Sequence, residues 1–342
     1  MIDVGILNIN SYGGIGLATL VDAHPALRLA AVAGHSSAGK TLRALFPAWG
    51  GPDLPVLEHL PPLDLVFSAL PHVAAANTLA PLVRDSIRVI DLSADFRLRD
   101  PAAYAEWYGH AHPAPDLLPR AVYGLTEVWG DEVATATLVA CPGCYPTATG
   151  LALAPVLAAR GLFNGGGHVV VDAKSGVSGA GRTLKTESLF SEADEGVAAY
   201  GLGGHRHLPE IEQTAKALSR DGMGASITFV PHLVPMTRGI LATVYVRPHE
   251  PIDAAALRAP YRDYYRRSPC VRVSDTPPST KWTLRTNLCV VHPTVDERTG
   301  MIVIVSCIDN LVKGAAGQAI QNANLMLGLP EETGLPLRAV WP

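Results

Sequence analysis

Cys144 is the residue whose neighbours in the sequence point most clearly to covalent chemistry. A short apolar run, Thr137 to Ala140, leads into Cys141-Pro142-Gly143-Cys144-Tyr145-Pro146, and an apolar helical pattern follows. Pro146 disfavours helical geometry at Tyr145 and is a good first helical residue, so we expect a helix that begins just beyond Cys144. A helix N-terminus lowers the pKa of a thiol and stabilises an oxyanion beside it. The pattern predicts that Cys144 is a nucleophile.

Two other interpretations of this segment stay open. A lone cysteine is most often a small buried apolar residue. Cys141 and Cys144 have C-x-x-C spacing, and with His205 and His207 they form a four-ligand zinc set on paper. Since the chain has no second C-x-x-C pair and Pro142-Gly143 also suits a tight catalytic turn, we expect no metal.

The segment Gly203 to Ile211 concentrates further reactive groups. It holds His205, Arg206, His207 and Glu210. A histidine can act as general acid or base near neutral pH, an arginine can bind an anion, and a glutamate can orient an imidazole. A solvated loop before a helix from Pro209 is the alternative.

A loop near the N-terminus predicts a dinucleotide site. The apolar run Val4 to Leu7 is followed by Asn8 to Gly16 and then by a helical pattern. Strand, glycine-containing loop and helix in this order bring backbone donors to a pyrophosphate. Only part of the usual glycine pattern is present, so a plain turn is the alternative, and the effect of Asn8 and Ser11 on cofactor binding is open. The predicted cofactor contacts are Ser11, Tyr12, Gly13 and Gly14.

The residues after the second predicted strand distinguish NAD from NADP. The run Leu27 to Ala33 is followed by His35-Ser36-Ser37-Ala38-Gly39-Lys40, without the acid that usually binds the ribose hydroxyl in NAD sites. Short hydroxyls and a cation suit a 2′-phosphate, so Ser36, Ser37 and Lys40 predict NADP(H). A simple polar turn is the alternative.

Hydrophobic periodicity predicts two domains that position these residues. Apolar runs at Leu63 to Phe67 and Val89 to Leu92, with a helix-like segment from His72 to Val83 between them, indicate a Rossmann-type doubly wound parallel sheet. Alternation from Ile240 to Arg247 indicates a mixed or antiparallel sheet in an α+β domain. We expect a final helix over Ala315 to Leu327. The predicted domains are residues 1–145, completed by a C-terminal helix within 315–342, and residues 146–314.

Length, charge and cysteine count limit the class of protein and its partners. A chain of 342 residues suits two domains of roughly 150 residues each. The net charge of −4, without a basic stripe, makes nucleic acid an unexpected partner. No segment resembles a signal peptide or a membrane-spanning helix, so we expect a cytoplasmic protein. Five cysteines, an odd number, are then expected to be reduced thiols.

Seven segments, in order, resemble the N-acetyl-gamma-glutamyl-phosphate reductases, relatives of aspartate-semialdehyde dehydrogenase. The resemblance runs over nearly the whole chain. The segments are Ala69–His72, Asp91–Leu98, Pro142–Thr147, Lys174–Arg182, His205–Ile211, Pro235–Gly239 and Asp309–Gly317.

The resemblance implies an activity and further site residues. The implied reaction is NADPH-dependent reduction of an acyl phosphate, with phosphate release, through a Cys144 thioester, with His205 as acid/base and a homodimer or homotetramer as the assembly. A carrier-protein-linked aminoadipyl-phosphate reductase and a non-catalytic NADP-binding sensor are the alternatives. The resemblance places Arg97, His207 and Glu210 at the substrate, and Ser175, Gly176, Gly179 and Asn310 near the nicotinamide.

Overall fold

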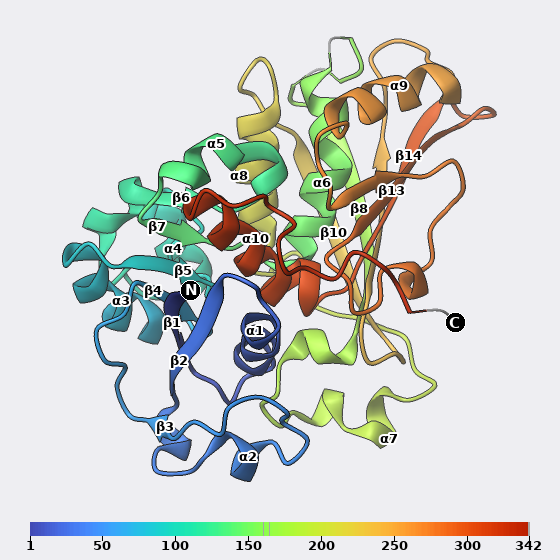
Figure 1. Ribbon diagram of the computed structural model, residues 1–342. Coiled ribbons are helices and arrows are strands. Elements are labelled where there is room, and N and C mark those ends of the chain that lie inside the picture. The colour runs from blue at the N-terminus through green and yellow to red at the C-terminus, as the bar shows by residue number, and fades with distance from the viewer. Residues whose placement is uncertain (160, 164, 341–342) are drawn as a thin grey trace. The chain divides into compact units, whose positions relative to one another are not determined.

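A computed structural model of the chain shows two compact units, each built on its own seven-stranded sheet (Figure 1). It describes residues 1–159, 161–163 and 165–340. The first unit contains residues 1–142 and 315–335, and the second contains residues 143–314 and the segment from Pro336 on. The roles predicted for two domains, divided at 145/146, stay predictions.

The sheet of the first unit is parallel throughout, in the order β3-β2-β1-β4-β5-β7-β6. Because β1 pairs with both β2 and β4, the winding reverses at β1, and ligands of such sheets bind at the carboxyl ends of the strands there. The predicted Rossmann-type sheet is confirmed. Its strands are β1 (Ile2–Leu7), β2 (Leu27–Ala33), β3 (Val56–Leu57), β4 (Leu65–Ser68), β5 (Arg88–Asp91), β6 (Ala121–Tyr123) and β7 (Leu138–Ala140).

Side-chain alternation along these strands builds a separate core on each face of the sheet. Leu65 and Phe67 of β4 pack into the core that contains residues of α1 and α10, whereas Val66 packs into the core that contains α3. Figure 1 shows α1 and α3 on opposite sides of β1. The helices are α1 (Tyr12–Asp22), α2 (Leu42–Leu45), α3 (Ala74–Arg84), α4 (Pro101–Tyr108), α5 (Thr126–Thr135) and α10 (Gly317–Met326).

The sheet of the second unit is mixed, in the order β12-β13-β14-β11-β8-β10-β9. β8 pairs in parallel with β10, and β12 with β13, while the other pairings are antiparallel. The predicted mixed sheet is confirmed. Its strands are β8 (His168–Gly176), β9 (Ala198–Ala199), β10 (Ser226–Val234), β11 (Ile240–Val246), β12 (Val271–Val273), β13 (Cys289–Asp296) and β14 (Met301–Ile308).

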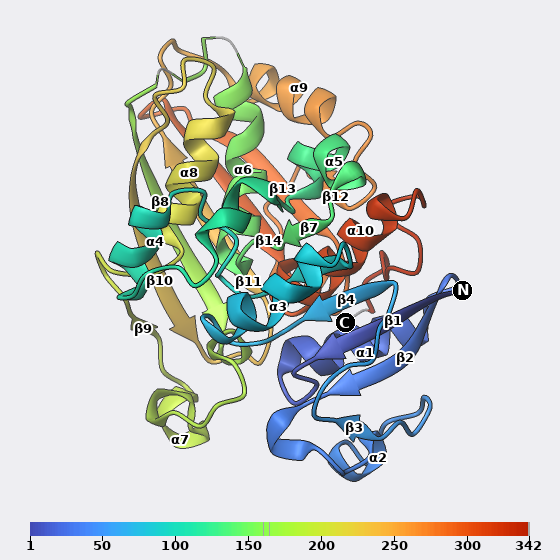
Figure 2. The same ribbon diagram turned by 90° about the vertical axis from the view of Figure 1, so that its left-hand side faces the viewer.

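Helices cover one face of this second sheet. Figure 2 shows α8, α6 and α9 along one side of it. β11 reflects this, since Ala242 and Val244 are buried on the helical face while Thr243 and Tyr245 stay half-exposed on the other. We call the half-exposed face the outer face. The helices are α6 (Cys144–Ala158), α7 (Phe190–Ala193), α8 (Leu208–Leu218) and α9 (Ala254–Tyr264).

Three helix limits differ from the predicted ones for local reasons. α3 begins at Ala74, because Val73 takes a positive φ of 68°. α6 begins at Cys144 itself, because the first turn of a helix needs no N–H from Pro146. α10 ends at Met326, so only part of the predicted C-terminal helix in 315–342 is helical. Within the described ranges, no helix is long and apolar enough to cross a membrane.

Candidate active site

The second unit holds Cys144 as the first residue of α6. Gly143 precedes it as the N-cap residue, with extended backbone (φ −63°, ψ 158°). The helix behind it is buried over thirteen of its fifteen residues, which makes the position of its first turn rigid. Cys144 is partly exposed, and its carbon atoms lie against Gly314, where a Cβ would come within 2.7 Å of Cys144 Cβ.

Glu210 fixes the turn that presents Cys144. Its side chain is buried, and its Oε1 accepts a hydrogen bond from the Gly143 N–H at 2.7 Å. His207 closes the other side of this turn, since a Cβ on Gly143 would lie 2.4 Å from His207 Nε2. Two residues predicted at the substrate therefore contact the backbone immediately before the predicted nucleophile.

His205 lies in a cage of aromatic rings. Its ring centroid is 5.7 Å from that of Tyr145, 5.5 Å from Tyr200 and 5.3 Å from Phe229, all in edge-to-face arrangements. Burial, with a smaller contribution from the neighbouring Arg206, lowers the pKa of His205 to about 4. The imidazole is therefore neutral at physiological pH and able to accept a proton.

Two of the rings in this cage also carry hydroxyl groups that form hydrogen bonds in series. Tyr200 donates to the hydroxyl of Tyr145 at 3.1 Å, and Tyr145 donates to the His232 carbonyl at 3.3 Å. Burial raises the pKa of Tyr200 to about 12, and the sulfur of Cys144 is close enough to contribute to that rise. Both phenols stay protonated, so they can donate hydrogen bonds but cannot act as bases.

The predicted nicotinamide-end residues of the second unit gather around Asn310. Its Nδ2 donates to Ser178 Oγ at 2.9 Å, and its Oδ1 accepts from the Gly239 N–H at 2.8 Å. Gly176 and Gly179 leave no room for a side chain, since a Cβ on them would lie 2.7 Å from Met236 O and 2.6 Å from Ser175 Oγ respectively. The structure thus brings Ser175, Gly176, Gly179 and Asn310 together.

In the first unit, the loop after β1 makes a tight turn. Asn8 takes the left-handed conformation with φ 61°, which asparagine tolerates better than most residues. The Ser11 side chain caps α1, with Oγ accepting from the Gly14 N–H and donating to Asn8 O, both at 2.9 Å. A Cβ on Gly14 would lie 2.3 Å from Asn8 O, so only glycine fits this position.

A cavity of about 640 Å³ lies beside this turn, at the carboxyl ends of β1 and β2. Asn8, Gly34, His35 and Ser36 line one part of it, and its size suits part of a dinucleotide. Its complete lining is Leu7, Asn8, Ala33, Gly34, His35, Ser36, Glu58, His59, Leu60, Leu70, Pro71, Ala74, Thr78 and Leu82.

Only one of the three residues predicted at the 2′-phosphate lines this cavity. Ser36 does, and its Oγ accepts from Asn10 Nδ2 at 3.1 Å. Ser37 is buried and donates to the Gly34 carbonyl, and Lys40 is not among the lining residues. Tyr12 and Gly13 also lie outside the lining, at the start of α1.

Comparison with known proteins identifies the family. Models described as "Semialdehyde dehydrogenase, NAD binding domain" and "Semialdehyde dehydrogenase, dimerisation domain" match residues 3–136 and 144–310. A Dehalococcoides mccartyi protein named N-acetyl-gamma-glutamyl-phosphate reductase is 48% identical over 99% of this chain and 98% of its own length. The Halorhodospira halophila protein of the same name is 49% identical over 98% of each chain. This chain belongs to the N-acetyl-gamma-glutamyl-phosphate reductase family.

Solved structures of proteins with low sequence identity share the fold of this reductase family member. Aspartate semialdehyde dehydrogenase II from Vibrio cholerae, in complex with ASA, has a TM-score of 0.73 at 17% identity, covering 96% of this chain and 98% of that one. The Candida albicans aspartate semialdehyde dehydrogenase with NADP has a TM-score of 0.67 at 15% identity, with 96% and 99% coverage. At these identities the likeness establishes the fold.

In this member of the reductase family, Arg97 is held by backbone carbonyls of the first unit. Its Nε donates to Cys141 O and its Nη2 to Leu92 O, both at 2.8 Å. The nearby Asp95 accepts from the N–H groups of Val73 and Ala76 and so caps α3. The predicted contact of Arg97 with the substrate stays a prediction.

Cys141 lies in a more buried environment than Cys144. It is fully buried, burial raises the pKa of its thiol to about 12, and Asn322 Nδ2 lies 3.6 Å from its sulfur. A zinc ligand must be a thiolate, which this environment disfavours. All five cysteines fall in the described ranges, where no disulfide joins them and no group of three metal-binding side chains is found.

Sequence reasoning missed three residues with titratable side chains that line the cavity beside the turn after β1. His35 and Glu58 approach each other to 3.6 Å, and His59 is the next residue along. Glu58 follows β3, a strand of only two residues that carries no periodicity. The one available signal was that His35 directly precedes the Ser36-Ser37 pair.

Proposed function

We propose that this protein reduces N-acetyl-gamma-glutamyl phosphate to N-acetylglutamate 5-semialdehyde with NADPH, releasing phosphate, as a step of arginine biosynthesis. The relatives that are 44–49% identical over nearly their full length carry the name of this activity. The observation that carries the proposal is the placement of Cys144 as the first residue of α6, on a turn fixed by Glu210. A binding protein without catalysis has no need for a partly exposed cysteine there.

The first proposed step is acyl transfer to sulfur. The Cys144 thiolate attacks the acyl carbon, a C–S bond forms, and the C–O bond to phosphate breaks as the phosphate leaves with its electron pair. The N-terminus of α6 supplies positive potential for both the thiolate and the oxyanion that forms during attack. The product is a thioester, which accepts hydride more readily than a carboxylate.

The second proposed step turns the thioester into the aldehyde. NADPH, when bound, would supply hydride to the acyl carbon. His205 delivers a proton to the oxygen of the resulting hemithioacetal during reduction and accepts it during semialdehyde oxidation. The hemithioacetal loses its hydroxyl proton to solvent as the C–S bond breaks, which releases the semialdehyde and the Cys144 thiolate. The neutral state of His205 in this structure prepares it for the oxidation direction, in which it must first accept a proton.

The residues of the first unit fit a dinucleotide. The tight turn at Gly14 and the exposed position of Tyr12 at the start of α1 allow a pyrophosphate near backbone donors. His35, Ser36 and His59 line the cavity and can meet a 2′-phosphate, whereas the Glu58 carboxylate, 3.6 Å from His35 Nδ1, opposes a phosphate there. The NADP preference rests on these histidines and on Ser36.

Glu210 and His207 receive a positioning role within the proposal. Since the Glu210 carboxylate is buried and bound to the Gly143 N–H, we assign it to holding the nucleophile rather than to the substrate. His207 packs against Gly143 and limits the movement of the same turn.

Assembly and location complete the proposal. The matched dimerisation model over residues 144–310 supports a homo-oligomer, and we propose a homodimer or homotetramer that works in the cytoplasm. Neither nucleic acid nor membrane takes part. Inorganic phosphate is the small-molecule partner of the reverse reaction.

The test is semialdehyde oxidation by the purified full-length protein, with NADP and NAD side by side and with phosphate present or absent. We expect phosphate-dependent oxidation with NADP, abolished by Cys144→Ser and retained by the matched variant Cys141→Ala. Substantial turnover by Cys144→Ser would refute covalent catalysis. Poor activity on free semialdehyde beside good activity on a carrier-linked substrate would favour the lysine-pathway reductase instead.

A further inference from the structure

Asp309 is a buried carboxylate that directly follows the last residue of β14. Its side chain is fully buried. Taking a carboxylate out of water is costly unless hydrogen-bond donors or cations replace the lost water. The groups that approach Asp309 therefore show which parts of the second unit this residue holds together.

All described contacts of the Asp309 carboxylate come from donors. Its Oδ1 accepts hydrogen bonds from the Leu311 N–H at 2.8 Å and the Val312 N–H at 3.1 Å, and its Oδ2 accepts one from the Arg285 N–H at 2.7 Å. The Arg238 guanidinium lies 3.5 Å from Oδ2. The position therefore needs two acceptor oxygens, whereas an asparagine turns its NH2 group towards one of these donors.

The same residue shapes the turn that follows it. Val312–Ala316 forms a π-helical turn. The first N–H groups of a helix have no acceptor within it, and the Asp309 side chain supplies one for Leu311 and Val312. The Asp309 carbonyl accepts from the Gly314 N–H at 2.9 Å, which is the i to i+5 bond of a π-helix. Side chain and backbone of one residue thus set the path of the chain up to Gly314.

The middle of this turn packs against the proposed nucleophile. A Cβ on Gly314 would lie 2.7 Å from Cys144 Cβ and 3.2 Å from Cys144 Cα, so the Gly314 backbone lies directly on the side chain of Cys144. No larger residue fits there unless one of the two moves. A shift of the turn therefore changes the space in which the Cys144 side chain rotates.

Asn310, the residue after Asp309, leads to the cluster predicted at the nicotinamide end. Its Oδ1 accepts from the Gly239 N–H at 2.8 Å, and its Nδ2 donates to Ser178 Oγ at 2.9 Å. Gly239 follows Arg238, whose guanidinium approaches the Asp309 carboxylate. The adjacent side chains of Asp309 and Asn310 thus hold the segment before β11 through two neighbouring residues.

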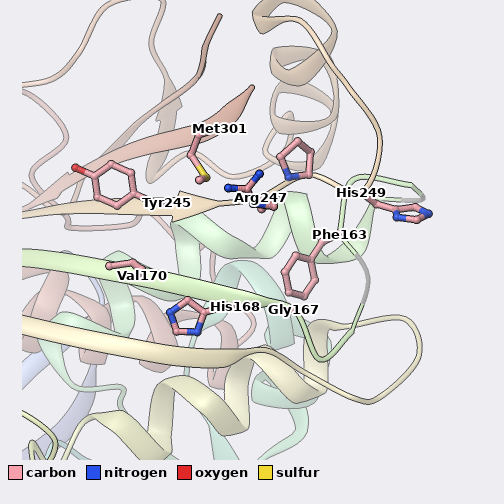
Figure 3. A pocket seen from close by; sticks show the side chains of 9 residues that line it. Phe163, Gly167, His168, Val170, Tyr245, Arg247, His249 and Met301 are labelled. Carbon is pink, nitrogen blue, oxygen red and sulfur yellow. The ribbon is translucent and has the colours of Figure 1, made fainter. Parts of the chain in front are cut away.

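The opposite end of β14 lies away from Asp309. Seven residue steps of extended strand lead from Met301 to Ile308, which corresponds to roughly 23 Å at about 3.3 Å per residue. Met301 and Tyr245 line the depression on the outer face that Figure 3 shows. A change at Asp309 should therefore leave that end of the sheet, and any contact that another copy makes there, unaffected.

We propose that Asp309 is a positioning residue for the reaction, because its carboxylate fixes the turn that holds Gly314 against Cys144. The same carboxylate fixes the chain on both sides of Asn310. This inference rests on the proposed function, in which the acyl group on Cys144 receives a hydride. Since Asp309 is fully buried, it acts through these neighbours. Its loss should lower kcat more than it changes KM.

The first experiment measures alkylation of Cys144 by iodoacetamide in the full-length protein, without NADP or substrate. The other four cysteines are buried, so Cys144 is the fast-reacting thiol, which mass spectrometry of its peptide verifies. In Asp309→Asn the rate at high pH, where the thiol is fully ionised, should differ at least about threefold from wild type, because the surroundings of the sulfur have moved. A lost negative charge alone shifts only the pH midpoint of the reaction.

The second experiment is semialdehyde oxidation with NADP and phosphate. If the sulfur moves by about 1 Å, Asp309→Asn should lower kcat on the order of 100-fold, with KM changed less than about threefold. The double variant with Asn310→Ala should lose little more than the more damaging single variant, because the two side chains hold one segment. A smaller folded fraction would instead multiply the two losses.

Asp253→Asn is the matched control in the same unit. Asp253 caps α9 through one hydrogen bond from the Ala256 N–H at 2.8 Å, and asparagine caps a helix equally well. This variant should change neither the alkylation nor the kinetics. Where Asp309→Asn fails to fold, Gly314→Ala tests the same contact from the other side and should also change the alkylation rate at high pH.

The outcomes separate this inference from the proposed function. Wild-type protein without phosphate-dependent oxidation removes the proposed function, while the alkylation test still reports on the contact between Gly314 and Cys144. Three results overturn the positioning role and leave the function intact: an alkylation rate at high pH equal to wild type in Asp309→Asn or Gly314→Ala, a rise in KM with kcat unchanged, or losses that multiply in the double variant.

Discussion

Replacing Glu210 separates two roles for this residue that the sequence could not distinguish. In the structure its carboxylate is buried and accepts the Gly143 N–H at 2.7 Å. Glu210→Ala leaves that N–H without its acceptor beside the proposed nucleophile, whereas Glu210→Gln can keep an oxygen there. A positioning residue affects the rate of the chemical step, while a substrate-binding residue affects substrate affinity.

The expected magnitudes follow from this geometry. A buried donor without an acceptor costs about 1–3 kcal/mol, so Glu210→Ala should lower the free energy of unfolding by about that amount. If the Gly143 turn relaxes and moves the sulfur of Cys144 by about 1 Å, kcat should fall on the order of 100-fold. Glu210→Gln loses only the charge assistance of the bond, about 1 kcal/mol, and should retain most of the rate.

The assay is steady-state semialdehyde oxidation with NADP and phosphate, together with urea unfolding of each variant. Glu212→Ala, an exposed glutamate on the same helix, is the matched control and should change neither kcat nor KM. A rise in KM of Glu210→Ala with kcat unchanged would show that the carboxylate binds substrate. That outcome refutes the positioning role.

Three further predictions concern the loop, a buried histidine and the proton acceptor. Gly14→Ala places a Cβ 2.3 Å from Asn8 O, so it should lower the free energy of unfolding in urea by about 1–3 kcal/mol and weaken NADP binding in a titration. Gly50→Ala has open space around its Cβ and should change neither quantity. Burial lowers the pKa of His24 in the folded state, so the unfolded chain binds a proton on His24 more readily than the folded one. The free energy of unfolding should therefore fall as the pH drops below about 6.5, and it should fall less steeply in His24→Gln. Because the pKa of His205 is lowered to about 4, protonation of His205 should not reduce the rate of semialdehyde oxidation between pH 5 and 7. A fall in that rate with an apparent pKa near 6.5, absent in His205→Asn, would contradict this.

The elements that the sequence predicted well are those whose signal is local. Leu27–Ala33 is strand β2 with the limits expected from its apolar run, and the alternation from Ile240 matches β11. β3 and β9 have two residues each, too few to show a period. They exist because longer neighbours offer a free edge for pairing, as β10 does for β9.

The same distinction applies to the site. Cys144 is recognisable because Gly143, Pro146 and the apolar helix behind it are its sequence neighbours. The cavity proposed for the nucleotide is different, since Glu58 reaches it only because Ala33 pairs with Leu57 and the Gly34 N–H bonds to Leu57 O. Composition near β2 also predicted Ser37 and Lys40, which stay predictions; in the structure the Ser37 hydroxyl donates to the Gly34 carbonyl within the short turn.

Different contacts fix the positions of Cys144 and of the loop after β1. Cys144 takes its position from α6, whose apolar residues are held by tertiary packing, so that its first turn needs only the bond from Glu210 to stay in place. The shape of the loop after β1 does not come from packing of a buried helix. It comes from the left-handed Asn8, the Ser11 cap and the lack of a side chain at Gly14. A conservative change therefore matters more at Gly14 than in the middle of α6, where volume-conserving replacements keep the packing.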